Sequence, residues 1–273
     1  MRVVISVDIE GASGLVSTKE TEEGAFDYQL ARKHLTHDCN AVIEGALEAG
    51  ATQIVLHDSH GYDFRSILLD ELHPAVEAVR GLPVFFFEQL GPGYDACFLV
   101  AGHAGPHRTQ AILSHLYTSQ FQEVRFNGTP VGEGEVTAAM AGSLGIPTTL
   151  VTGDDVVCAD VKAVIPYIET AVIKYSLSRY AGRCLPLEKT YAILKEAGYR
   201  ALQNLDQRKP FVYEGAIEVE VLCDTGYHAR LYADMGRAEW DGYKTVRYTA
   251  DDIWDAYRFL TLGLYLLSSR LVP

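Results

Sequence analysis

The chain has 273 residues and a formal net charge of -13, and 48% of its residues are hydrophobic and 22% charged. This composition is typical of a folded protein with a substantial core and argues against disorder. The negative charge would repel a phosphate backbone, so it argues against nucleic acid as a partner and favours cationic or neutral substrates.

The first half of the chain alternates apolar strands with helices. A strand is expected at residues 3–7, a helix with apolar residues at three-to-four spacing at 27–49, and a second strand at 53–57. Further elements are expected as strands at 83–87, 97–102 and 148–155, a hairpin turning at Asn127-Gly128, and a helix over 136–144. This order predicts an α/β fold with a mostly parallel sheet flanked by helices and a site at the carboxyl ends of its strands.

The order of elements changes in the second half. A helix is expected at 187–205, an alternating strand at 216–222, a strand over 244–249 and a closing helix from residue 251. We therefore expect an α/β metal-binding catalytic domain over residues 1–165. A smaller α+β lobe over 166–273 would complete the fold and supply assembly contacts. The closing helix is apolar on several sides, which predicts burial either in the core of one subunit or between subunits.

The cysteines and the apolar runs indicate where in the cell the protein is expected. The five cysteines are scattered and form no Cys-x-x-Cys pair, which predicts neither a disulfide framework nor a thiolate zinc site. Residues 3–7 are too few for the core of a signal peptide, and no apolar run is long enough to span a bilayer. We expect a cytoplasmic protein without membrane contacts.

Acidic residues and histidines follow the expected strands at the points where the strands end. They are Asp8, Glu10, His60 and His103, and Glu133 lies in a glycine-flanked turn before an expected helix. Asp8 and Glu10 lie two positions apart, so they project to the same side. Such close carboxylates favour a positive partner, either a basic side chain or a metal ion, unless the strand end is simply solvated. Taken singly, each residue has an ordinary structural explanation, such as a loop cap, an arginine partner or a packed histidine. Taken together, carboxylates and imidazoles predict a site for zinc, manganese or cobalt, with Asp8 able to bridge two ions.

Other polar residues near these positions have structural interpretations or stay open. His57 is expected to point to the opposite face of its strand, where it either packs or supports a ligand from behind. Asp58 is expected to cap a loop or to orient His60. His115 follows the segment after His103, and the sequence leaves open whether it reaches the site.

Five short phrases occur in an order and spacing that resemble the M55 family of zinc-dependent D-aminopeptidases, the DppA type. They are SVDIEG (6–11), HDSHG (57–61), AGHAG (101–105), LSH (113–115) and PVGE (130–133), and further echoes are VTGDD (151–155) and LQN (202–204). Two positions depart from the family pattern, because His57 stands where the family has Asn and Glu135 where it has a hydrophobic residue.

The resemblance implies a metal-dependent aminopeptidase that hydrolyses short peptides whose first residue is a D-amino acid such as D-Ala. It implies two zinc ions per subunit and a homo-oligomeric ring, possibly a decamer. The ligands that it implies are Asp8, which bridges, Glu10, His60, His103 and Glu133. It assigns the catalytic role to His115, which would stabilise an oxyanion or transfer a proton.

Two other classes remain to be distinguished. One is a dinuclear metal phosphoesterase, but few basic residues lie near the motifs, the nearest being Arg108 and Arg125. The other is a non-catalytic or nucleotide-binding α/β domain. The phrase GASG after the first strand lacks the glycine spacing and the lysine of a phosphate-binding loop, so this class has little support.

Overall fold

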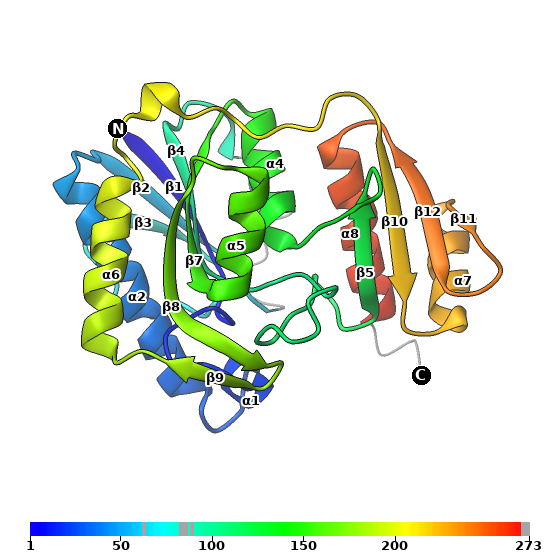
Figure 1. Ribbon diagram of the computed structural model, residues 1–273, viewed down its shortest axis with the longest axis horizontal. Helices are drawn as coiled ribbons and strands as arrows, with labels where there is room; N and C mark the ends of the chain where they lie inside the picture. Colours follow the sequence, from blue (N-terminus) through cyan, green and yellow to red (C-terminus); the bar gives the residue numbers. More distant parts are fainter. Residues whose placement is uncertain (62–63, 82–86, 88–89, 269–273) are drawn as a thin grey trace.

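The computed structural model describes residues 1–61, 64–81, 87 and 90–268, and its strands form two separate sheets (Figure 1). The large sheet has the strand order β3-β2-β1-β4-β7-β8-β9, in which only the β8–β9 pair is antiparallel. Its strands are β1 (Arg2–Val7), β2 (Gln53–Asp58), β3 (Val76–Val79), β4 (Ala96–Gly102), β7 (Thr148–Asp154), β8 (Glu169–Ser178) and β9 (Ala181–Cys184). This confirms the predicted, mostly parallel α/β fold.

Helices cover both faces of the large sheet. They are α2 (Tyr28–Glu48), α4 (Glu133–Ser143), α5 (Asp155–Val164) and α6 (Leu187–Arg200), and the short α1 (Thr18–Thr21) packs against α2. Successive residues of β1 point to opposite faces. Val4 packs in the same cluster as Val161 of α5, whereas Ile5 packs in the cluster that contains Leu194 of α6. Burial on both faces explains why the central strands are continuous apolar runs.

Helices α2 and α6 lie side by side on one face of the sheet (Figure 1). Two glycines allow this close approach. A Cβ atom on Gly45 of α2 would lie 1.9 Å from the carbonyl oxygen of Lys195, and a Cβ on Gly198 of α6 would lie 2.4 Å from that of Val42. The backbones of the two helices therefore touch where neither residue carries a side chain.

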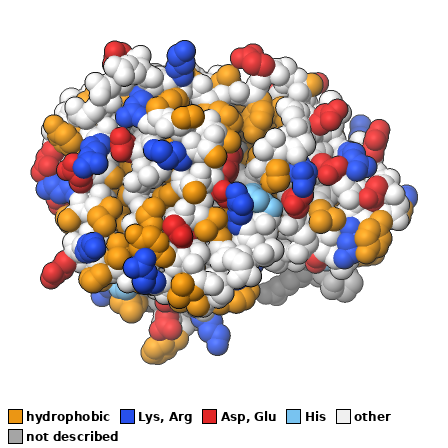
Figure 2. Space-filling view, in the orientation of Figure 1, with side chains coloured by type: hydrophobic (Ala, Val, Ile, Leu, Met, Phe, Trp, Pro, Cys, Tyr) orange, Lys and Arg blue, Asp and Glu red, His pale blue; other side chains and the backbone are white. Residues whose placement is uncertain are grey.

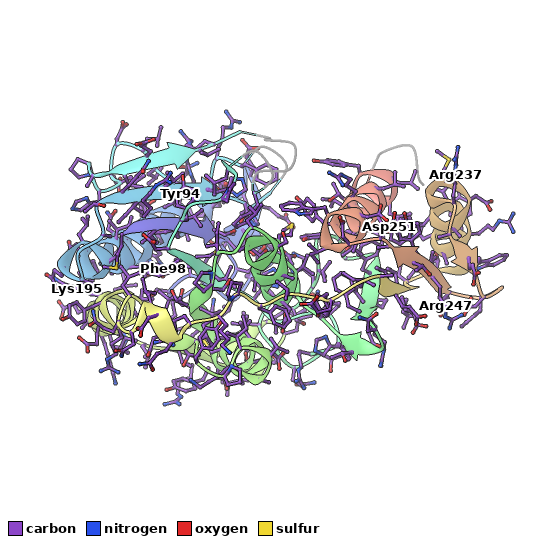
Figure 3. The ribbon with its side chains drawn as sticks, turned by 90° about the horizontal axis from the view of Figure 1, so that it is seen from above. Tyr94, Phe98, Lys195, Arg237, Arg247 and Asp251 are labelled. Carbon is purple, nitrogen blue, oxygen red and sulfur yellow. The ribbon has the colours of Figure 1, made fainter. Side chains whose placement is uncertain are left out.

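The small sheet is antiparallel and has the strand order β11-β12-β10-β5-β6. Its strands are β5 (Phe121–Phe126), β6 (Thr129–Pro130), β10 (Ile217–Cys223), β11 (Glu239–Trp240) and β12 (Thr245–Ala250), and its helices are α7 (Gly226–Gly236) and α8 (Ile253–Leu267). The predicted turn joins β5 to β6, and both Asn127 and Gly128 have positive φ angles, of 49° and 79°. In Figure 3, Phe98 and Lys195 mark the large-sheet side of the molecule, and Arg237 and Arg247 mark the small-sheet side.

The two sheets do not divide the chain at residue 165. Strands β8 and β9 and helix α6 come after this position but belong with the large sheet, whereas β5 and β6 come before it and pair into the small sheet. The division into 1–165 and 166–273 stays a prediction about folding units, although sheet membership crosses it in both directions.

Three further expectations from the sequence concern a helix, a strand and a membrane span. The expected helix 187–205 ends at Arg200 and is followed by a 3-10 helix over Leu205–Gln207. Positions 83–86 of the expected strand 83–87 lie outside the described residues. Among the residues that are described, no helix has both the length and the apolar character needed to cross a bilayer.

Candidate active site

The predicted site residues meet at the carboxyl edge of the large sheet. Asp8 directly follows β1, His103 directly follows β4, and His60 lies two residues beyond β2. These three strands are neighbours and run parallel, so their carboxyl ends lie at the same edge. Glu133 joins them as the first residue of α4.

The two carboxylate oxygens of Asp8 face two different histidines. Its Oδ1 lies 3.1 Å from Nδ1 of His60, and its Oδ2 lies 3.1 Å from Nε2 of His103. Each histidine faces one further acid: His60 Nδ1 is 3.1 Å from Glu10 Oε2, and His103 Nε2 is 3.5 Å from Glu133 Oε1. The arrangement consists of two groups of donors that share Asp8.

The outward nitrogens of these histidines contact backbone carbonyl oxygens. His60 Nε2 lies 2.9 Å from the oxygen of Thr21, and His103 Nδ1 lies 3.1 Å from that of Ala104. Because a carbonyl only accepts, each of these nitrogens carries the hydrogen. In neutral imidazoles the lone pairs of His60 Nδ1 and His103 Nε2 then point at the carboxylates, and a cation between them is required to make this contact favourable.

Two buried atoms in the site make no hydrogen bond to any described residue. They are Glu10 Oε2 and His103 Nε2. The donor atoms of Asp8, Glu10 and His103 also lie within 4.8 Å of one another. Buried polar atoms are normally hydrogen-bonded, so unsatisfied atoms within a convergent set of donors fit a metal ion. Carboxylate oxygen with imidazole nitrogen is a donor set that suits zinc.

The electrostatics of the site also favour a cation. Burial alone would lower the pKa of His60 and of His103, but the adjacent carboxylates outweigh it and hold both pKa values well above the ordinary range. Burial would raise the pKa of Asp8, but its contacts with His103 and His60 hold that pKa well below its usual range. The carboxylates of the site therefore favour a positive charge among them. Protons on the two histidines can supply it, and so can a metal ion that displaces those protons.

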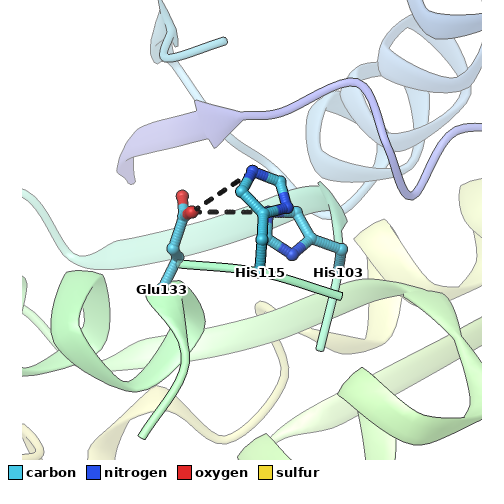
Figure 4. Close-up of side chains that lie close together, drawn as sticks. All are labelled: His103, His115 and Glu133. Atoms are coloured by element: carbon cyan, nitrogen blue, oxygen red, sulfur yellow. Dashed lines mark ion pairs between the residues drawn. The ribbon is translucent and has the colours of Figure 1, made fainter. Parts of the chain in front are cut away.

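His115 joins the site through an unusual contact with a neighbouring histidine. Its ring stacks on that of His103, with the centroids 4.1 Å apart and the planes 6° apart. Its Nε2 lies 3.9 Å from Oε1 of Glu133, as Figure 4 shows, while its Nδ1 lies 2.8 Å from the carbonyl oxygen of Leu113. The question that the sequence left open is answered, because His115 does reach the site. Its donor atom lies within 4.8 Å of those of His103 and Glu133, so the geometry alone permits it to be a ligand.

The loop that carries His115 has an unfavourable backbone conformation at two positions. Leu113 and Tyr117 have positive φ angles, of 49° and 56°, which residues other than glycine rarely adopt. In this conformation the backbone N–H of Tyr117 donates a hydrogen bond of 2.7 Å to Oε1 of Glu133. The strained loop therefore both presents His115 and orients Glu133.

A cavity of about 440 Å³ opens over the site. Asp8, His60, His115 and Glu133 lie in its lining. Much of the remaining wall is apolar and includes Phe64, Met140, Trp254, Tyr257 and Leu264. The last three belong to α8, so the closing helix from the small-sheet side lines the site. Leu260 and Leu267 of the same helix are buried in the core, so its several apolar faces have different partners.

Other polar residues have structural roles. Asp58 is fully buried and accepts a hydrogen bond of 2.8 Å from the N–H of Ile67, which agrees with a loop cap. Glu135 is buried and accepts from the N–H of Gly132 at 2.9 Å, at the start of α4. His57 lines the cavity, and burial lowers its pKa to about 3, so it is neutral near pH 7.

The two arginines nearest the motifs are paired with acids. Arg108 donates two hydrogen bonds to the carboxylate of Asp160, and Arg125 pairs with Glu123. These pairings weaken the case for either arginine as a phosphate ligand. On the face shown in Figure 2, Lys and Arg side chains are interspersed with acidic ones.

Lys174 of β8 is a residue that the sequence reasoning missed. It is fully buried, and burial lowers its pKa to about 8. Its Nζ donates to the carbonyl oxygens of Glu10, Ala12 and Leu15. A charged residue inside the apolar run AVIKY was the available signal.

Comparison with known proteins places the chain in a family. The sequence profile of the M55 peptidases, described as D-aminopeptidases, matches residues 1–262. The chain belongs to this family. A curated D-aminopeptidase of Bacillus subtilis (strain 168) is 29% identical, with 94% of each chain covered. Membership confirms the resemblance found in the sequence, and it favours an aminopeptidase over the phosphoesterase and the binding domain.

A solved structure agrees with the fold. The chain is similar to the zinc-dependent D-aminopeptidase DppA from Bacillus subtilis, described as a self-compartmentalizing protease. The TM-score is 0.91, the sequence identity is 28%, and 99% of each chain is covered. The likeness therefore includes both sheets.

Proposed function

We propose that this M55 peptidase is zinc-dependent and removes D-amino acids such as D-Ala from the amino ends of short peptides. The observation that carries this proposal is the placement of Asp8, whose two oxygens face His60 and His103 separately. With Glu10 and Glu133, these residues would offer each of two ions one histidine and one acid, and Asp8 could serve both. The zinc-dependent D-aminopeptidase that shares the fold supports zinc as the metal.

Zinc bound here would lower the pKa of water and polarise the carbonyl group of the scissile bond. The protein's part is to hold donors and to transfer protons. Because Nδ1 of His115 faces the carbonyl oxygen of Leu113, Nε2 is the atom that faces the reaction. We assign to His115 Nε2, in the protonated form of the ring, either the transfer of a proton to the leaving amine or a hydrogen bond to the developing oxyanion.

The cavity supports a small substrate with a free amine. Asp8 and Glu133 line the cavity, so the ions that they would hold lie within reach of a substrate, whose free amine could bind zinc as a neutral nitrogen donor. The apolar wall from α8 excludes water and contacts the rest of the substrate. The net charge of -13 attracts cationic substrates.

We extend the proposal to assembly and location. The related DppA is described as self-compartmentalizing, which supports a homo-oligomeric ring, with ten subunits as the specific expectation. Assembly would also cover apolar side chains that are exposed in the single chain, such as Phe26 and Leu177, which are 97% and 67% exposed. We place this assembly in the cytoplasm.

One set of measurements tests the function. The purified protein is loaded with zinc, its metal content is measured, and it is assayed on the para-nitroanilides of D-Ala and L-Ala and on para-nitrophenyl phosphate. We expect two zinc ions per chain and hydrolysis of the D-Ala compound in preference to the other two. Preference for L-Ala would contradict the D-specificity, and turnover of the phosphate ester alone would contradict peptidase function.

A further inference from the structure

A buried lysine is bonded to the backbone of a candidate metal ligand. The side chain of Lys174 has no exposed surface. Its Nζ lies 2.5 Å from the carbonyl oxygen of Glu10, 3.0 Å from that of Ala12 and 2.7 Å from that of Leu15. An ammonium group has three N–H donors, and here all three are used on one short loop.

Burying this charge is costly. The direct partners of Lys174 are uncharged carbonyl groups. Burial lowers its pKa to about 8, outweighing the nearby charges of Asp154, Asp38 and Glu10, which favour the protonated lysine. An apolar side chain of similar length, such as methionine, would fill the same space without desolvating a charge. We therefore attribute the presence of the ammonium group to its three hydrogen bonds, which hold three carbonyl groups of one loop together.

The same loop is fixed from two other directions. The N–H of Gly11 donates to the carbonyl oxygen of Ala101 at 2.8 Å, and a Cβ atom on Gly11 would lie 2.1 Å from the carbonyl oxygen of Gly102. Ser13 is bonded through both its N–H and its hydroxyl group to Asp38 of α2. The loop thus lies against the end of β4, next to His103, and Lys174 holds it from the β8 side.

Glu10 is the residue through which Lys174 is linked to the candidate metal site. The carbonyl group of this residue accepts from Lys174, while its carboxylate lies 3.1 Å from His60 Nδ1. Fixing the carbonyl group fixes the peptide plane and limits the directions that the carboxylate can take. A ligand held in place before the ion arrives loses less conformational freedom on binding.

We propose that Lys174 is a positioning residue that orients Glu10, and with it the loop beside His103, for metal binding. This inference rests on the proposed zinc site but not on the identity of the substrate. Lys174 acts through the backbone and contacts neither the metal nor the substrate. The opposite expectation follows from charge alone, since removing a nearby positive charge would leave zinc affinity unchanged or make binding tighter.

The test is zinc affinity, measured by competition with a chromophoric chelator on metal-free protein. In Lys174→Met we expect affinity to fall by about 10–100-fold, the usual range for residues that orient ligands. The matched control is Lys162→Met, which removes another lysine that donates to a backbone carbonyl, that of Ile168 at 3.1 Å, on the outer helix α5. The control should retain wild-type affinity.

Folding is measured separately, by circular dichroism and thermal melting of the metal-free proteins. If Lys174→Met does not fold, Lys174→Gln replaces it, because the amide keeps donors for part of the loop and should weaken zinc binding less. Unchanged or tighter zinc binding in the folded variant, Met or Gln, would overturn the proposal. A wild-type protein that binds no zinc would overturn it together with the proposed metal site. Zinc binding without hydrolysis of D-amino acid amides would count against the proposed function alone.

Discussion

The rings of His103 and His115 stack 4.1 Å apart and nearly parallel, and Nε2 of each lies within 4 Å of the same oxygen of Glu133. One histidine is fully buried among the acids, and the other lines the cavity. We expect the two histidines to have the different roles that the family resemblance implied, His103 as a metal ligand and His115 as a group that faces the substrate.

Replacing His115 by alanine tests this separation. We expect His115→Ala to keep its zinc and its melting temperature and to lose kcat by about 10²–10⁴-fold, the usual cost of removing one proton donor or oxyanion donor. Metal analysis, a melting curve and steady-state kinetics measure the three quantities. His228→Ala is a control at a histidine that bonds Asp224 in the small-sheet half. Loss of zinc along with activity would make His115 a ligand, and an unchanged kcat would exclude it from catalysis.

Asp8 is the residue whose loss should affect both ions. Asp8→Asn keeps the shape of the side chain but replaces one carboxylate oxygen by a donor and removes the charge. We expect zinc content to fall for both ions and activity to be lost, while circular dichroism stays that of the wild type. Asp251→Asn, at an exposed position, should behave as the wild type. Full zinc content and near-normal turnover in Asp8→Asn would show that it does not bridge.

Stability at low pH should depend on His57. Its pKa is about 3 in the folded protein and about 6.5 when unfolded. Between these values the unfolded chain binds one more proton at this residue, so the free energy of unfolding falls as the pH falls from 6.5 towards 3. The slope from this residue is at most about 1.4 kcal/mol per pH unit.

The measurement for His57 is urea unfolding at a series of pH values. His57→Asn removes the titrating group, so the difference in stability between variant and wild type should change in the variant's favour as the pH falls. A difference that stays constant from pH 7 to pH 4 would show that His57 takes up its proton without penalty.

The contact of α2 with α6 should tolerate no added side chain. In Gly45→Ala the new methyl group would meet the carbonyl oxygen of Lys195, so the helices must move apart. We expect a loss of about 1–3 kcal/mol in the free energy of unfolding, measured with urea, despite the better helix propensity of alanine. Lys33→Ala, on the exposed side of α2, should change it by less than about 0.5 kcal/mol. A more stable Gly45→Ala would contradict the observed packing.

Much of the large sheet could be predicted because its signals are local. Apolar runs followed by polar residues gave β1, β2 and β4, and the rule that parallel strands end at one edge brought Asp8 and His103 together. The sheet to which a strand belongs is a different matter. Strands β5 and β6 read as an ordinary hairpin, and pairing with β10, about 90 residues later in the chain, depends on long-range contacts.

The residues missed in the site share a physical reason. Lys174 was hidden because its role depends on three carbonyl groups about 160 residues away in the chain, and backbone groups leave no mark on the sequence. In the sequence of α8, the apolar stripe indicates only that one face of the helix is buried. Whether core, partner or substrate covers it depends on geometry, and Trp254, Tyr257 and Leu264 line the cavity.

The wall that α8 provides has a consequence for how this enzyme can diverge. The donors that would hold the metal come from the ends of β1, β2 and β4 and from α4, whereas part of the cavity wall comes from α8, far along the chain. Mutations in α8 can therefore alter the choice of peptide while the machinery that breaks the bond stays intact. Substrate preference and bond cleavage can therefore change at separate positions of the chain.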